Sequence, residues 1–163
     1  MEYKEIIQQN IFANRNDVEW SRRLAYWRFK NQKIVFTNGC FDILHRGHVE
    51  YLMQAAAKGD VLIVGLNSDS SVKKIKGTNR PVNPQEGRAL ALVSFRFVHA
   101  VVLFEEDTPY ELIAQIKPEV LVKGGDYKKE NIVGSDLVLQ YGGTVEIIPF
   151  IEGFSTSKIL EQL

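Results

Sequence analysis

The chain reads Phe36-Thr37-Asn38-Gly39-Cys40-Phe41-Asp42-Ile43-Leu44-His45-Arg46-Gly47-His48 between an apolar run and a pattern typical of a helix. His45 and His48, three residues apart, would share one face of the first helical turn. That turn also offers free backbone N–H groups and a partial positive charge, which suit a phosphate. The stretch therefore predicts an anion site where a strand passes into a helix.

Short β-branched runs alternate with helical patterns along most of the chain. Continuous apolar runs of this kind are typical of strands buried on both faces of a parallel sheet. The alternation predicts a doubly wound, Rossmann-like α/β fold with a mostly parallel five-stranded sheet and helices on both faces. The predicted strands are residues 34–36, 61–64, 98–104, 120–122 and 145–148. We expect one domain over residues 31–163, preceded by an N-terminal helical extension over residues 1–30.

Capping patterns place two of the helices between these strands. Asn83-Pro84 and Thr108-Pro109 each put a capping residue before proline, with glutamate three residues after the cap. Both patterns predict a helix start.

Polar and glycine-rich segments follow four of the five predicted strands. They are residues 38–48, 67–69, 123–127 and 153–157. Because ligands of open α/β sheets bind outside the carboxyl ends of the strands, these segments should converge on one site.

Composition excludes several classes of partner. Lysine and arginine balance aspartate and glutamate at 20 each, which gives no basis for a nucleic-acid or membrane surface. Cys40 is the single cysteine, so an internal disulfide is excluded and a reducing compartment is favoured. With no signal-peptide pattern at the N-terminus, we expect a cytoplasmic protein.

The H-x-G-H pattern of residues 45–48 resembles the nucleotidylyltransferase superfamily, over nearly the whole stretch 33–160. The segments 77–84, 104–109 and 121–127 are similar to one branch of it, the adenylyltransferases that make ADP-heptose from D-glycero-β-D-manno-heptose 1-phosphate and ATP. The resemblance implies attack of a sugar 1-phosphate oxygen on the α-phosphorus of ATP, used as its Mg²⁺ complex. Its product would be a precursor of the lipopolysaccharide core.

The resemblance also assigns roles to residues. It implies that His45, His48 and Lys123 are catalytic. The two histidines would form hydrogen bonds to the phosphates and stabilise charge as pyrophosphate leaves, and Lys123 would bind a phosphate or the acceptor. The expected nucleotide-binding residues are Thr37, Asn38, Gly39, Phe41, Gly47, Lys76, Arg88, Gly124, Asp126, Ser155, Thr156 and Ser157. We expect no dedicated protein metal site, because the phosphates and water would hold the Mg²⁺ ion.

Several assignments have alternatives at this point. Lys73 or Lys74 could replace Lys76 on the phosphates, and Asp42 could fix its loop or act near a metal. The segment 67–69 could line the acceptor pocket or only cap a helix.

The assembly state is also open. Trp20 and Trp27, together with the habit of the family, favour a homodimer. The alternative is that both tryptophans pack on their own domain.

Two other functions compete with the adenylyltransferase. One is a cytidylyltransferase for glycerol 3-phosphate or a related alcohol phosphate. The choice between ATP and CTP separates it from the adenylyltransferase. The other is a non-catalytic nucleotide-binding module.

Overall fold

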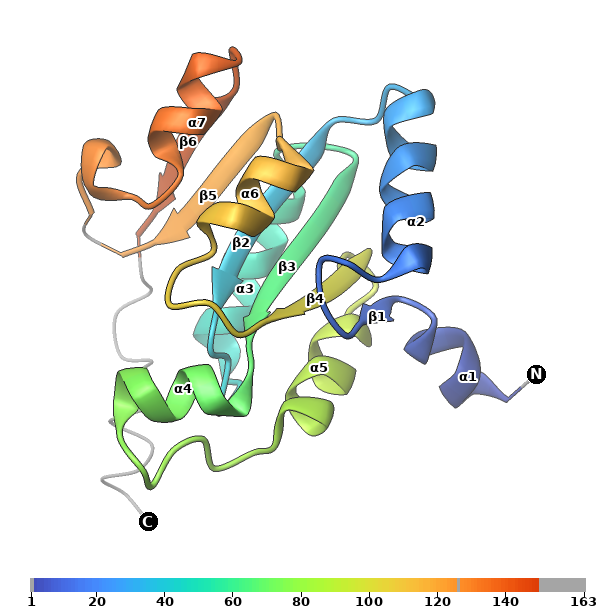
Figure 1. Cartoon of the computed structure of the whole chain (residues 1–163), viewed down its shortest axis with the longest axis vertical. Helices are drawn as coiled ribbons and strands as arrows, with labels where there is room; N and C mark the ends of the chain where they lie inside the picture. Colours follow the sequence, from blue (N-terminus) through green and yellow to red (C-terminus); the bar gives the residue numbers. More distant parts are fainter. Residues whose placement is uncertain (1, 126, 150–163) are drawn as a thin grey trace.

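The computed structural model describes residues 2–125 and 127–149. Their core is a sheet of six parallel strands in the order β1-β4-β3-β2-β5-β6 (Figure 1). The strands are β1 (Ile11–Phe12), β2 (Ile34–Gly39), β3 (Val61–Asn67), β4 (Ala100–Phe104), β5 (Val120–Gly124) and β6 (Thr144–Ile148).

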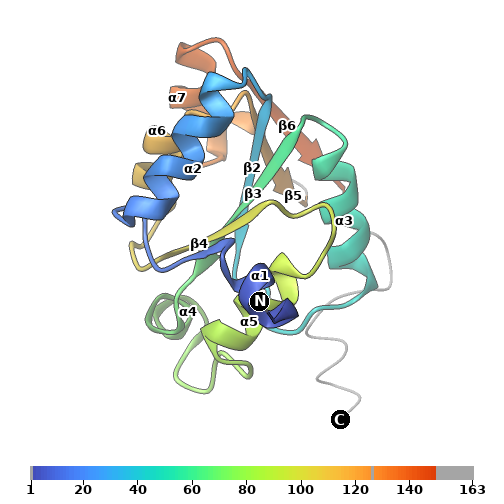
Figure 2. The same ribbon diagram turned by 90° about the vertical axis from the view of Figure 1, so that its right-hand side faces the viewer.

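Helices cover both faces of this sheet, which confirms the doubly wound fold (Figure 2). The helices are α1 (Tyr3–Gln8), α2 (Val18–Phe29), α3 (Arg46–Ala56), α4 (Asp69–Lys76), α5 (Gln85–Val93), α6 (Tyr110–Ile116) and α7 (Ser135–Gln140), with a 3-10 turn η1 (Lys129–Asn131). α2, α6 and α7 pack on one face, and α3 and α5 pack on the other. No helix in residues 2–125 or 127–149 has the length and apolar character that crossing a membrane requires.

Alternating side chains of the strands build two cores, one on each face. Along β2, Ile34 and Phe36 pack in the core under α2, α6 and α7, whereas Val35 packs in the core under α3 and α5. Every strand between the two edges therefore needs apolar residues on both faces, which explains the continuous apolar runs.

The sheet has a sixth strand that the sequence analysis did not predict. β1 comes from the first thirty residues and pairs with β4, Ile11 beside Val101 and Phe12 beside Val102. Phe12 is buried against Trp20, with ring centroids 5.3 Å apart. A two-residue strand has no periodicity to detect, so only the tertiary structure reveals it. The N-terminal segment is thus part of the sheet and its core.

Both tryptophans of α2 pack on their own domain. Trp20 is fully buried and its indole Nε1 donates a hydrogen bond to Gln115 at 3.0 Å, and Trp27 is 6% exposed. They therefore offer no surface to a second chain. The homodimer stays a prediction.

The two predicted helix starts lie one residue beyond their prolines. α5 begins at Gln85 and α6 at Tyr110, and neither has a side-chain cap. The side-chain amide Nδ2 of Asn83 instead donates to the backbone carbonyl of Asp42 at 2.6 Å. A contact between distant loops has replaced the local cap that the sequence suggested.

The strand order fixes where a ligand can enter. From β2 the chain runs outward through β3 to β4, and it then crosses to β5 and β6 on the other side. The strand order reverses between β2 and β5, and this reversal is the switch point of the sheet. A ligand crevice of such a sheet forms outside the carboxyl ends of these two strands. Gly39 and Gly124 are the last residues of these two strands.

Candidate active site

The two histidines lie side by side at the start of α3. His45 is the N-cap residue, and His48 follows in the first turn with its amide bonded to the His45 carbonyl at 2.9 Å. The imidazole rings stack with centroids 3.9 Å apart and planes 29° apart. The structure thus confirms the shared face that their spacing predicted.

Burial keeps both rings uncharged at neutral pH. Desolvation is the largest cause that lowers the pKa of His48 from 6.5 to about 4, and its proximity to His45 and to the Lys76 ammonium accounts for the rest of this shift. Burial lowers the pKa of His45 as well. Each neutral ring can donate one N–H hydrogen bond to an incoming phosphate oxygen.

Phe41 orients the inner histidine. Its ring meets that of His48 edge-on, with centroids 5.4 Å apart and an interplanar angle of 64°. Phe41 has a positive φ of 45°, and only 7% of its surface is exposed. A Cβ at Gly39 would lie 3.0 Å from that ring, which explains why glycine precedes the loop. The buried ring of Phe41 therefore packs against the imidazole of His48.

Lys76 is the lysine of α4 whose charge acts on His48. It contributes to the lowered pKa of His48, whereas Lys74 forms an ion pair with Asp107 at 3.6 Å. Lys73 and Lys76 are both exposed. The electrostatic contact with His48 favours Lys76 among the three candidates.

Lys123 and Asn38 face each other where β5 and β2 end. Lys123 Nζ lies 3.5 Å from the Asn38 side-chain oxygen and 5.9 Å from the ring centre of Tyr127. Burial lowers the pKa of Lys123. Gly125, the second of the two glycines that follow Lys123, has φ 111°, a conformation that favours glycine. The structure thus places Lys123 in the crevice at the switch point.

The predicted nucleotide-binding residue Thr37 has a fully buried side chain. Its hydroxyl lies 2.6 Å from the hydroxyl of Tyr51 on α3. Because no part of Thr37 is exposed, nucleotide binding by Thr37 stays a prediction.

Arg88, another predicted phosphate ligand, is committed to the protein. Its guanidinium donates to Asp69 at 2.7 Å, to the carbonyl of Cys40 at 2.6 Å and to the carbonyl of Asn83 at 3.0 Å. The side chain has no exposed surface. Phosphate binding by Arg88 stays a prediction, and its observed partners make it a link between the loop after β2, α4 and α5.

Asp42 is the main structural residue whose partners the sequence analysis did not identify. It accepts hydrogen bonds from the amides of Val82 and Asn83 at 2.8 and 2.9 Å and forms an ion pair with Arg80 at 2.6 Å. Burial alone would raise the pKa of Asp42, but these bonds and the Arg80 charge outweigh it and lower the pKa. This supports the loop-fixing role that was one of the two alternatives.

The segment after β3 caps α4. The Ser68 hydroxyl accepts a bond from the Ser71 amide at 3.2 Å, and the Asn67 amide donates to the Ser71 hydroxyl at 2.9 Å. The contacts of these residues therefore agree with the alternative that residues 67–69 cap a helix.

Four predicted site residues lie outside the described residues: Asp126, Ser155, Thr156 and Ser157. Gly47 and Gly124 lie where expected, in the first turn of α3 and at the end of β5. Within residues 2–125 and 127–149, no group of three or more histidine, cysteine, aspartate or glutamate side chains could hold a metal ion.

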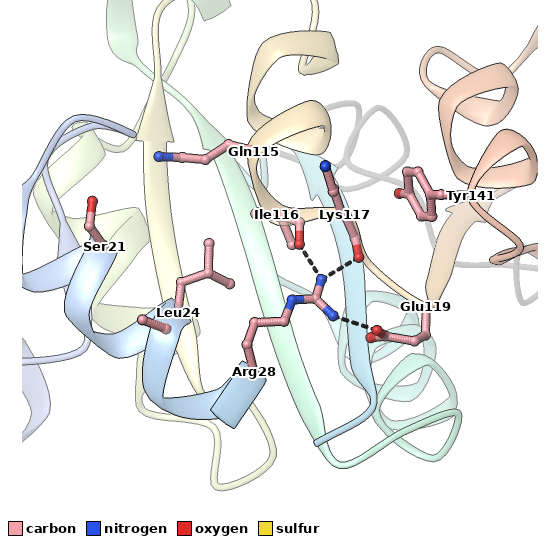
Figure 3. Close-up of a pocket in the computed structure, with 9 residues that line it drawn as sticks. Ser21, Leu24, Arg28, Gln115, Ile116, Lys117, Glu119 and Tyr141 are labelled. Atoms are coloured by element: carbon pink, nitrogen blue, oxygen red, sulfur yellow. Dashed lines mark hydrogen bonds and ion pairs between the residues drawn. The ribbon is translucent and has the colours of Figure 1, made fainter. Parts of the chain in front are cut away.

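A hollow of about 470 Å³ lies at the other end of the sheet (Figure 3). In its wall, Arg28 of α2 donates to the carbonyls of Ile116 and Lys117 and pairs with Glu119. Glu119 immediately precedes β5, so the hollow is at the amino ends of the strands. It is therefore separate from the histidine site.

Comparison with known proteins gives consistent similarities. A family model described as cytidylyltransferase-like matches residues 36–161. The chain is 58% identical over 137 residues to the bifunctional protein HldE of Wolinella succinogenes, covering 84% of this chain and 28% of that protein. It is 60% identical over 140 residues to the protein of the same name from Campylobacter jejuni subsp. doylei, covering 86% of this chain and 30% of that protein. The chain thus spans less than a third of the length of these curated relatives.

Among solved structures, the chain is similar to the lipopolysaccharide core biosynthesis protein from Thermoplasma volcanium. The TM-score is 0.59 at 26% sequence identity, and the match covers 74% of this chain and 97% of that one.

Proposed function

The chain belongs to the cytidylyltransferase-like family, and from this premise we propose that it transfers AMP from ATP to D-glycero-β-D-manno-heptose 1-phosphate. The products would be ADP-heptose and pyrophosphate. The observation that carries the proposal is the stacked pair His45 and His48 at the start of α3, outside the switch point of a parallel sheet.

The electrostatics of this site suit a polyphosphate. The N-terminus of α3 supplies backbone donors and a partial positive charge, and the neutral rings of His45 and His48 supply further N–H donors. Lys76 adds a full positive charge close to His48, and Lys123 adds another at the end of β5. Donors and cations from α3, α4 and β5 would therefore surround a bound polyphosphate.

The choice of ATP and heptose 1-phosphate is supported by similarity. The two curated relatives named bifunctional protein HldE are 58–60% identical to this chain over most of its length. A similar solved structure is that of a lipopolysaccharide core biosynthesis protein. The segment 77–84, which resembles the heptose branch in sequence, directly follows Lys76 in the chain, and the similar segment 121–127 contains Lys123.

The proposed step is a single displacement at phosphorus. A heptose 1-phosphate oxygen forms a bond to the α-phosphorus of ATP, and the bond from that phosphorus to the bridging oxygen of pyrophosphate breaks. The nucleophile is already an anion, so no base has to remove a proton. Catalysis then depends on alignment and on stabilising negative charge. His45 and His48 would donate to the phosphate oxygens, and Lys76 would hold the leaving pyrophosphate.

The test is release of pyrophosphate with Mg²⁺, crossing ATP and CTP with heptose 1-phosphate and glycerol 3-phosphate. We expect turnover with ATP and heptose 1-phosphate. His48→Ala should lower kcat more than about tenfold, which corresponds to about 1.4 kcal/mol of activation free energy. Met53→Ala is the matched control, because Met53 lies exposed on the same helix. Turnover with CTP and glycerol 3-phosphate, or a His48→Ala variant as active as the control, would contradict the proposal.

A further inference from the structure

The hydrogen-bond ladder between β2 and β5 ends just before the site. The two strands pair at Val35 with Val120 and at Phe36 with Leu121, and the pairing extends no further toward their carboxyl ends. On its other side, β2 stays paired with β3 as far as Gly39 and Leu66. The carboxyl end of β2 is thus held by the ladder on one side only.

A tyrosine from α3 lies where this ladder stops. The Tyr51 hydroxyl lies 2.6 Å from the Thr37 hydroxyl and donates to the Val122 carbonyl at 3.4 Å. Thr37 and Val122 are the residues that follow the last paired positions of β2 and β5. One phenol therefore spans the two strands at the point where their backbones cease to bond.

The residues beside this bridge are the predicted site residues. Thr37 precedes Asn38 in β2, and Val122 precedes Lys123 in β5. Tyr51 itself lies three residues after His48 on α3, about one helical turn further along. A single hydroxyl thus connects the three elements that carry Asn38, Lys123 and His48.

We propose that Tyr51 is a positioning residue, whose hydroxyl sets the separation of β2 and β5 at which Asn38 and Lys123 face the substrate and ties both strands to the helix of His48. The role in turnover rests on the proposed function. The role in holding the strands rests on the hydrogen bonds alone.

The chemistry of the bridge favours a hydroxyl held in one place. A buried phenol costs free energy unless its oxygen finds partners, so Tyr51 stays where both Thr37 and Val122 can be reached. Burial raises the pKa of Tyr51 to about 12, so the proton remains on the oxygen. Since Tyr51 donates to Val122, Thr37 is the donor in the other bond.

The test compares four variants in the enzyme assay. Tyr51→Phe keeps the ring and removes the bridge, and Thr37→Val removes one end of it at nearly constant shape. Ile113→Val is the control, because Ile113 is fully buried on the opposite face of the sheet. We expect Tyr51→Phe to lower kcat about tenfold at nearly constant KM for ATP, since misplacing reacting groups affects the transition state. Combining Tyr51→Phe with Thr37→Val should lower kcat little further.

Amide hydrogen exchange of the same variants tests the bridge without any substrate. Tyr51→Phe should increase exchange about tenfold at Asn38 and Lys123 and leave the amides of β4 unchanged. Ile113→Val should change neither the amide exchange of Asn38 and Lys123 nor kcat. Unchanged exchange at both residues would overturn the inference, and so would a kcat of Tyr51→Phe within twofold of wild type. A wild-type protein without turnover on ATP and heptose 1-phosphate would instead refute the proposed function, and the exchange result would still decide the role of Tyr51.

Discussion

Replacing Asp42 by asparagine should destabilise the protein by about 3 kcal/mol, because breaking a buried ion pair leaves its partner's charge uncompensated. The Asp42 side chain is 1% exposed and that of Arg80 is 16% exposed. The carboxylate also accepts the amides of Val82 and Asn83, and asparagine keeps only one acceptor oxygen for these partners. Hydrogen bonds to a charged group are worth about 1.5–3 kcal/mol each, which agrees with this magnitude.

Thermal and urea unfolding at pH 7 measure the effect. A loss of this size corresponds to a Tm decrease of about 6–12 °C for a chain of this length. Asp107→Asn is the matched control, because Asp107 makes an exposed ion pair with Lys74 and should change stability by less than about 0.5 kcal/mol. Combining Asp42→Asn with Arg80→Gln should cost less than the sum of the two changes.

The pH dependence of this contribution has a definite sign. The folded-state pKa of Asp42 lies below its usual value of 3.8, so the stabilisation is present above that value. It is lost as pH falls through the lower, folded-state pKa, and the difference between wild type and Asp42→Asn should shrink there. Equal stability of wild type and Asp42→Asn at pH 7, or strict additivity with Arg80→Gln, would refute the reasoning.

Three further predictions concern stability and nucleotide binding. Phe12→Ala should cost about 3–5 kcal/mol in urea unfolding because Phe12 is buried beside β4, whereas Phe29→Ala, at an 82% exposed position, should cost under about 0.5 kcal/mol; similar losses would show that β1 is not part of the core. Because the pKa of His48 falls from 6.5 to about 4 on folding, wild type should lose stability as pH falls from 6.5 to 4, and His48→Asn should remove about 1 kcal/mol of that loss between pH 7 and 5; an unchanged pH dependence contradicts this. Lys76→Ala should raise the KM for ATP about tenfold, with Lys73→Ala within twofold of wild type; equal effects would remove the special place of Lys76.

The sequence was enough to predict the elements whose signals are local. Continuous apolar runs predicted the five longer strands, and the spacing of His45 and His48 predicted their shared face. β1 was missed because two residues carry no periodicity, and its strand character depends on pairing with β4. The prediction of the fold class rested on many residues, so it was correct although β1 was not predicted.

The partners of charged side chains could not be predicted in the same way. Arg88 and Asp42 both lie in or near segments that carry site residues, and sequence alone does not distinguish a ligand contact from a structural one. Arg88 donates to residues 5, 19 and 48 positions away in the chain, and Asp42 binds residues about 40 positions away. Such contacts exist only after the loops meet, so composition and periodicity contain no trace of them.

The structure divides the charged and polar groups near the crevice into two kinds, and this division has a physical reason. A polyphosphate site needs positive charge that the protein itself does not neutralise, whereas a buried charge inside the fold must be paired. Arg88 and Arg80 are paired with Asp69 and Asp42, so these cations hold loops together. Lys76 pairs with no carboxylate of the described residues, and His48 Nδ1 has no hydrogen-bond partner among them. Lys76 and His48 are therefore groups that an incoming phosphate can satisfy, which is why mutation of either should affect turnover more than stability at pH 7, and mutation of Asp42 the reverse.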